Sequence, residues 1–213
     1  FILGRLALLG QTTVFYAKPN VGKTLLTMRL LMDSIENGTI NGDDVYYINA
    51  DDHYKGLTYK LELAEKSGFK MLAPGHKGFK AEMLTKVLTS LIQTDQARGK
   101  VLILDTVKKF TDIMRKDKTS EFMESVRQFI SNGGSAIMLA HVNKNRDEDG
   151  KVIFAGTSDM YDDCDCAYTI DFGNMTMQAM DGNRIIKFQN FKCRGDVDLE
   201  AVYQYNGAQG VPY

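Results

Sequence analysis

The sequence predicts an α/β fold, with a mostly parallel central sheet, helices on both faces and a β-rich C-terminal edge. Two observations support this. Strand-like and helix-like segments alternate through about the first two thirds of the 213 residues. From about residue 167 onward the apolar segments are strand-like only, and Asp181-Gly182 is a typical hairpin turn between two of them. We expect one domain over residues 1–213, and a chain that begins at Phe1 rather than Met is compatible with excision from a longer protein.

The composition is that of an ordinary globular domain, with 44% hydrophobic and 25% charged residues. A net charge of −1 creates no general basic field, so contacts with nucleic acid would have to come from local patches. No apolar run approaches the roughly 18–20 residues of a membrane span, and no secretory signal is visible. The three cysteines are too few and odd in number for a disulfide framework. We therefore expect a cytoplasmic protein without a membrane partner.

In the first half, helices are predicted from apolar residues that recur on one helical face, and strands from short β-rich runs. The expected order is a strand at 12–16, a helix from 25 that stops at Asn37-Gly38, a strand at 45–50, and helices at 54–67 and 79–97. Residues 69–77 read as a turn because they contain Pro74-Gly75.

The second half contains two continuous apolar runs, at 101–104 and 136–140, of the kind found in buried parallel strands. Thr119 is a plausible cap for the helix between them, which Gly133-Gly134 would stop. The second run ends at His141. The remaining expected strands are 167–172, 175–179, 184–191 and 199–205.

Residues 17–24 follow the phosphate-binding loop pattern G-x-x-x-x-G-K-[ST], with Ala17 in place of the first glycine. Gly22 would let backbone N–H groups close around phosphate, Lys23 would reach the β- and γ-phosphates, and the Thr24 hydroxyl would ligate Mg²⁺. The candidate nucleotide-binding residues are Ala17, Lys18, Pro19, Asn20, Val21, Gly22, Lys23, Thr24 and Leu25.

Two considerations oppose this interpretation. The glycine that Ala17 replaces often takes a backbone angle that alanine resists. The tripeptide at 22–24 could also open a buried helix that binds no ligand. The order of strand, loop and helix around the pattern favours nucleotide binding, with ATP and Mg²⁺ as the expected ligands.

Asp105 follows Lys100 and four apolar residues, which is the form of the second nucleotide-binding signature. A charge at the end of a buried strand is costly unless it meets a cation or hydrogen-bond donors. We expect Asp105 to serve the Mg²⁺ site together with Thr24. The alternative is that Asp105 merely caps the following segment through Thr106.

ATP hydrolysis also needs a group that activates water, and Thr106 stands where ATPases of the AAA+ kind usually have their glutamate. Ala50-Asp51-Asp52 instead resembles the Ala-Glu-Asp of RecA-like ATPases, especially hexameric replicative helicases of the plasmid RepA and DnaB kinds. This resemblance implies a RecA-like P-loop NTPase core with Asp51 as general base. Asp52 could serve instead, hydrolysis could be slow, or the pair could be a turn or capping cluster.

Three further segments fit the same family. Residues 105–110 resemble its Asp-Thr-Leu-Arg-Arg-Phe segment. Residues 139–144 resemble its fourth strand, which implies His141 as a γ-phosphate sensor; a histidine at a strand end is otherwise an ordinary hydrogen-bonded residue. Residues 191–195 resemble its Lys-x-Arg signature, which implies that Arg194 acts in trans on a neighbouring subunit's ATP and that Lys192 approaches the γ-phosphate. The alternative is a solvated basic turn.

The resemblance implies a homo-oligomeric ring, such as a hexamer, that hydrolyses ATP as a DNA helicase or translocase on single-stranded DNA in DNA replication. Two stretches could contact the strand: 108–118, with five basic residues and Phe110 for stacking, and 143–154, where acidic residues offset the basic ones. Such runs are usually solvated loops. Two alternatives remain: a RecA-like regulatory or loader ATPase without unwinding activity, and a nucleotide-binding module with little turnover.

Overall fold

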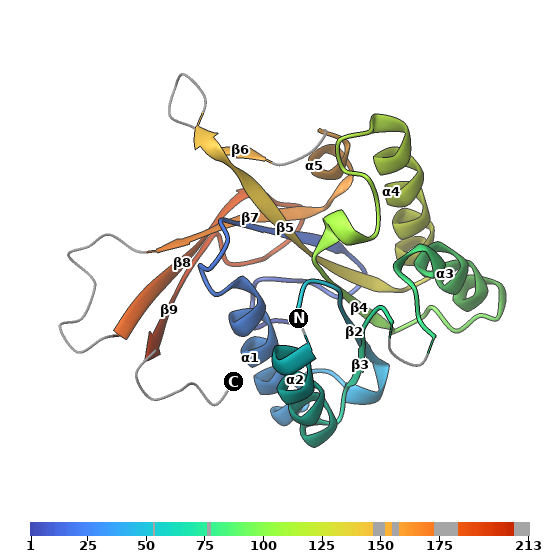
Figure 1. Cartoon of the computed structure of the whole chain (residues 1–213), viewed down its shortest axis with the longest axis horizontal. Coiled ribbons are helices and arrows are strands. Elements are labelled where there is room, and N and C mark those ends of the chain that lie inside the picture. Colours follow the sequence, from blue (N-terminus) through green and yellow to red (C-terminus); the bar gives the residue numbers. More distant parts are fainter. Residues whose placement is uncertain (53, 76–77, 147–151, 155–157, 173–182, 207–213) are drawn as a thin grey trace.

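The structure is a computed structural model that describes residues 1–52, 54–75, 78–146, 152–154, 158–172 and 183–206 (Figure 1). The strands are β1 (Thr12–Ala17), β2 (Val45–Asn49), β3 (Lys70–Leu72), β4 (Val101–Asp105), β5 (Ser135–Arg146), β6 (Val152–Phe154), β7 (Cys166–Phe172), β8 (Asn183–Lys192) and β9 (Glu200–Asn206). The helices are α1 (Lys23–Glu36), α2 (Tyr54–Ser67), α3 (Leu84–Gln93), α4 (Lys116–Ser131) and α5 (Asp159–Asp163). Short 3₁₀ turns are η1 (Gly42–Asp44), η2 (Ala81–Met83) and η3 (Val107–Lys109).

The strands form one mixed sheet in the order β3-β2-β4-β5-β1-β7-β8-β9, and β6 pairs with β5 outside this path. Neighbouring strands from β3 to β7 run parallel, whereas β8 and β9 are antiparallel. Helices α1 and α2 cover one face, and α3 and α4 cover the other (Figure 1). The α/β class, the mostly parallel sheet and the β-rich C-terminal edge are confirmed.

Burial on both faces explains the continuous apolar runs. Every residue of β1 and β4 is buried, and successive side chains enter opposite core clusters, as the alternation of a strand requires. In β4, for example, Ile103 packs beneath α1, while Leu102 and Leu104 pack beneath α3 and α4. Parallel strands between two helical layers must be apolar on both faces, which is why no polar alternation marks them.

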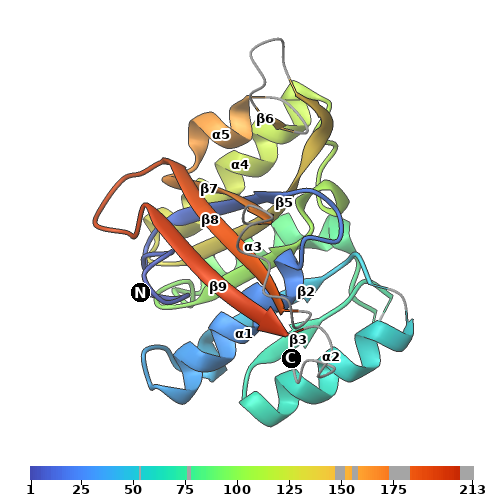
Figure 2. The same ribbon diagram turned by 90° about the vertical axis from the view of Figure 1, so that its left-hand side faces the viewer.

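The N-terminal segment adds to the core beneath α1. Ile2, Leu3 and Leu6 are fully buried in that cluster, and the segment passes close to β8 and β9 (Figure 2). Arg5 holds it there through ion pairs of 3.1 Å with Asp196 and Asp198. No strand or helix was predicted for this segment.

Several element boundaries were predicted wrongly. Residues 69–77 contain strand β3, which is too short to show an alternating pattern and takes its place by pairing with β2. The helix expected at 79–97 is divided into η2 and the shorter α3. Thr119 is not a cap, because α4 already begins at Lys116 and the Thr119 hydroxyl donates back to the carbonyl of Arg115 at 3.0 Å.

The strand expected to end at His141 continues to Arg146, because its polar second half pairs with β6. Helix α5 was not predicted. The expected strand at 175–179 and the turn at Asp181-Gly182 lie outside the described residues. Within the described part, no helix is long and apolar enough to cross a membrane.

The turn η1 packs against the end of α2, and we expect Gly42→Ala to be destabilising. A β-carbon at residue 42 would collide with the carbonyl oxygen of Gly68. Overpacking against backbone typically costs about 1–3 kcal/mol, to be measured as the free energy of unfolding in urea. Gly56→Ala is the matched control, because its β-carbon has room within α2 and should stabilise the helix by about 0.5–1 kcal/mol. Equal stability of Gly42→Ala and wild type would contradict the packing described.

Candidate functional site

The turn between β1 and α1 has the backbone expected of an anion-binding loop. Asn20 and Gly22 adopt left-handed conformations, with φ of 66° and 99°, and Gly22 is the N-cap of α1. Turns of this kind direct successive N–H groups into a concave site, and the helix N-terminus favours negative charge there. Ala17 is extended, as the last residue of β1. The expectation that this position needs a glycine angle is therefore wrong for this chain.

Strand alternation brings four strand-end residues to one face of the sheet. The cluster beneath α1 contains Tyr47, Ile103 and Leu139. Each stands two positions before a strand residue of the site, namely Asn49 in β2, Asp105 in β4 and His141 in β5. The next residues on that face are thus Asn49, Asp105 and His141 themselves, beside Ala17 of β1. Since these strands are parallel, all four residues lie at the carboxyl edge, where α1 begins.

A cavity of about 390 Å³ opens at this edge. It is lined by Lys18, Pro19, Asn20, Gly22, Lys23, Thr24 and Leu25 of the loop and by Asp51, Asp52, Lys60 and His141. Of the predicted loop residues, Ala17 and Val21 are buried beneath it. The cavity thus joins the loop between β1 and α1 to the carboxylates that follow β2.

Lys23 and Asp105 form a buried ion pair at the base of the site. The ammonium lies 3.7 Å from Asp105 Oδ1, and the two side chains are only 7% and 2% exposed. Burial lowers the pKa of Lys23, while the charges of Asp105 and Asp51 act in the opposite direction. A cation that has lost its water in this way interacts strongly with an anion that enters the cavity.

The other oxygen of Asp105 is held by a tyrosine. Tyr47, from β2, donates its hydroxyl to Asp105 Oδ2 at 2.9 Å, and burial together with the Asp105 charge raises the pKa of Tyr47 well above its usual range. Asp105 Oδ1 is buried and has no hydrogen-bond partner in the described structure. An orphan carboxylate oxygen beside a phosphate loop fits a role in binding a cation or its water.

The two consecutive aspartates after β2 differ in their surroundings. Asp52 accepts a hydrogen bond of 2.5 Å from Asn49 Nδ2 and is ion-paired with the buried Lys60. Asn49 Oδ1 also accepts from the backbone N–H groups of Asp51 and Asp52, each at 3.3 Å. The Asp51 side chain is 39% exposed, and its Oδ2 lies 3.9 Å from His141 Nε2. Asp51 is therefore the carboxylate left available to a ligand.

His141 lies within β5, opposite Ala17, and its side chain is 18% exposed. Burial lowers its pKa, as do the charges of Lys23 and Lys108, against a smaller opposite effect of Asp51. The imidazole is consequently neutral at pH 7, with a ring N–H that can donate. Neither ring nitrogen has a hydrogen-bond partner in the part of the chain that the structure describes.

The residues present fit a magnesium–nucleotide complex better than a metal held by protein alone. No group of three or more His, Cys, Asp or Glu side chains among the described residues could hold a metal. Mg²⁺ usually takes one or two protein oxygens, with phosphate and water completing its shell. Thr24 in the cavity wall and the orphan oxygen of Asp105 supply oxygens of this kind.

Lys192 and Arg194 lie at the opposite end of the sheet. Lys192 pairs with Ala167 near the start of β7 and donates to the carbonyls of Tyr161 and Asp162, at 2.6 and 2.8 Å. Arg194 is 63% exposed and forms a 3.3 Å ion pair with Asp165. The length of β1, roughly 17 Å, separates this end from the phosphate loop. The structure does not bring these two residues to the site of their own chain.

The first basic stretch follows β4 directly. Lys108 and Lys109 are exposed in η3, whereas Phe110 is partly buried against the core beneath α3 and α4. Arg115 and Lys118 are ion-paired with Asp117 and Glu121. In the second stretch, 147–151 lie outside the described residues. Lys108 and Lys109 therefore remain as exposed basic residues of the first stretch close to the site, in addition to Lys18 in the cavity wall.

Sequence reasoning missed Tyr47, Asn49 and Lys60. Tyr47 and Asn49 stand two apart in a strand, so they share a face, and that spacing was the available signal. Lys60 sits in an amphipathic helix and gave none.

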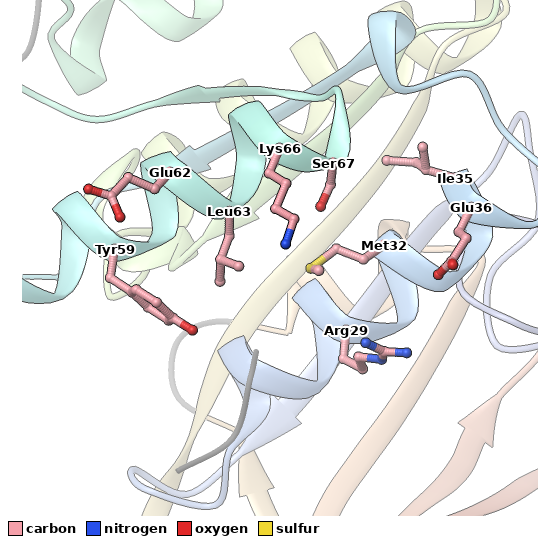
Figure 3. A pocket seen from close by; sticks show the side chains of 9 residues that line it. All are labelled: Arg29, Met32, Ile35, Glu36, Tyr59, Glu62, Leu63, Lys66 and Ser67. Atoms are coloured by element: carbon pink, nitrogen blue, oxygen red, sulfur yellow. The ribbon is translucent and has the colours of Figure 1, made fainter.

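A larger cavity, of about 750 Å³, lies between α1 and α2 (Figure 3), and its lining contains none of the predicted site residues. Its lining mixes apolar and charged side chains: Arg29, Met32, Ile35, Glu36, Tyr59, Glu62, Leu63, Lys66 and Ser67.

Comparisons of the chain with models of protein families and with curated proteins found no match.

We expect His141 to make the protein less stable in mild acid. Its pKa is lower in the folded than in the unfolded chain, so the unfolded chain takes up the proton first as the pH falls below about 6.5. This contribution is fully present above that pH and is lost as the pH falls through the folded-state pKa. Urea unfolding at pH 7.5, 6 and 5 should show a steeper loss for wild type than for His141→Gln. Parallel pH profiles would refute the buried neutral imidazole.

Proposed function

We propose that the protein is a Mg²⁺-dependent ATPase with a RecA-like P-loop core, and that hydrolysis drives an oligomeric helicase or translocase on single-stranded DNA in replication. One observation carries the proposal: Lys23, Asp51 and His141 come from three separate segments and line one cavity, and Asp105, from a fourth segment, is ion-paired with Lys23 at its base. The general architecture of the fold agrees with it, because ligands of open α/β sheets bind at the carboxyl edge.

In this function the loop N–H groups and Lys23 bind the β- and γ-phosphates. The Thr24 hydroxyl holds Mg²⁺, with Asp105 in the outer shell. The cation supplies charge that stabilises the transferring phosphoryl group. Because Lys23 and Asp105 are already paired in a dry site, little reorganisation is needed when the nucleotide arrives.

Asp51 acts as the general base toward the attacking water, and the neutral His141 donates a hydrogen bond to the γ-phosphate. The engagement of Asp52 with Asn49 and Lys60 favours Asp51 for this role. Aspartate is one methylene shorter than the glutamate of the family that the chain resembles. That difference favours the second candidate, a nucleotide-binding module with little turnover.

Arg194 acts in trans, because it lies too far from its own phosphate loop, and Lys192 would leave the α5 carbonyls to approach the same γ-phosphate. An arginine that enters a neighbour's site stabilises transition-state charge. The active form is then a homo-oligomer, with a hexameric ring as the form that the resemblance implies. Lys108 and Lys109 are the described residues best placed to contact a DNA backbone.

Steady-state ATP hydrolysis with and without single-stranded DNA tests the whole proposal. We expect turnover that requires Mg²⁺, rises with DNA, and falls by at least about 100-fold in Lys23→Ala, since phosphate binding and charge stabilisation are lost together. Lys86→Ala, an exposed lysine of α3, is the matched control and should match wild type. Turnover indifferent to DNA would favour the regulatory or loader ATPase, and tight binding without turnover would favour the nucleotide-binding module.

The two aspartates can be separated by isosteric variants. We expect Asp51→Asn to lower kcat by about 10²–10⁴, the usual contribution of a general base, with ATP affinity retained. Asp52→Asn should instead lower the free energy of unfolding by about 1–2 kcal/mol, because Lys60 loses its counter-charge. The loss is smaller than for a fully buried ion pair because the Asp52 side chain is partly exposed. The reverse pattern would transfer the general-base role to Asp52.

A further inference from the structure

Tyr47 is fully buried, and its ring packs in the core cluster beneath α1. It lies on β2, where it pairs in register with Ile103, and Asp105 is two residues further along β4 on the same face. Its hydroxyl crosses this interval to reach Asp105 Oδ2 at 2.9 Å. A phenylalanine would fill the same volume, so the hydroxyl needs a separate explanation.

We propose that Tyr47 is a positioning residue that fixes the Asp105 carboxylate, with Oδ2 occupied and Oδ1 presented to Lys23 and to the magnesium–nucleotide complex. The inference rests on the proposed function and adds a residue that the phosphate-loop chemistry does not itself require.

The geometry gives the hydroxyl a specific effect. The terminal torsion of an aspartate is broad, so a carboxylate held on one side only can turn. In the described part of the chain, the Asp105 carboxylate accepts from the Tyr47 hydroxyl on Oδ2 and lies 3.7 Å from the Lys23 ammonium on Oδ1. Without the hydroxyl, the carboxylate is free to turn both oxygens toward Lys23. It would then hold the lysine more tightly and present less negative charge to a cation.

A role in stability alone predicts something different. Removal of any buried hydroxyl leaves its hydrogen-bond acceptor unsatisfied and lowers stability, wherever the hydroxyl lies. Tyr168 provides the comparison, because it is also fully buried and donates to the carbonyl of Asp198 at 2.8 Å, on β7 and away from the cavity. Only a positioning role makes Tyr47 alter the response to Mg²⁺ while Tyr168 does not.

The experiment measures the affinity of the full chain for a fluorescent ATP analogue, first in EDTA and then across a Mg²⁺ titration. For Tyr47→Phe we expect the half-saturating Mg²⁺ concentration to rise about tenfold or more, the usual effect of removing a group that orients a metal-site ligand. Affinity in EDTA should change by less than about twofold. Tyr168→Phe should leave both quantities at the wild-type values.

An unchanged Mg²⁺ titration in Tyr47→Phe, with wild type responding to Mg²⁺, overturns the inference and leaves the proposed function standing. Failure of wild type to bind the nucleotide at all overturns the proposed function and the inference with it.

A double variant tests the pathway through Asp105 and serves also if Tyr47→Phe alone does not fold, because Asp105→Asn removes the buried charge that the hydroxyl satisfies. Tyr47→Phe in the Asp105→Asn background should cause no further change in Mg²⁺ dependence. A further tenfold change there would mean that Tyr47 acts independently of Asp105, and would overturn the inference.

Discussion

The buried pair of Lys23 and Asp105 is the interaction on which the rest of the site depends. Either charge alone would be costly in a position 7% or 2% exposed, so each requires the other. Lys23 begins α1 after β1, and Asp105 ends β4, with β5 between the two strands. The pair can form only if these strands are parallel and end at the same level. The strand order of the sheet therefore determines whether the buried ion pair of the site can form.

Strand β2 connects this ion pair to the two consecutive aspartates, Asp51 and Asp52. Its inward residues, Tyr47 and Asn49, hold respectively Asp105 and the segment that contains Asp51 and Asp52. The catalytic candidates thus rest on side chains of a buried strand rather than on loops alone. Groups supported in this way keep their geometry when a ligand enters, which is the condition for electrostatic stabilisation at low reorganisation cost.

The features predictable from the sequence were those with strong local signals. The loop at 17–24, the buried runs of β4 and β5, and the fold class follow from residue pattern and alternation. Strand β3 and the second half of β5 were missed because pairing with a neighbouring strand, rather than local pattern, makes them strands. The partners of the acids were missed for a similar reason. Lys60 is ion-paired with Asp52 eight residues earlier, a spacing that matches no motif, and only the folded geometry distinguishes Asp51 from Asp52.

The position of Arg194 has a consequence for symmetry. The arginine and the cavity lie at opposite ends of the sheet, roughly the length of β1 apart. If one copy's arginine completes the next copy's site, each contact joins two different surfaces, and the interface is heterologous. A two-fold dimer would have to make the contact twice, with each arginine in the other copy's cavity, so both surfaces of each copy would have to face the partner at once. Repetition of the contact either closes into a cyclic ring or continues as an open helical filament, and the rotation between neighbours alone decides which.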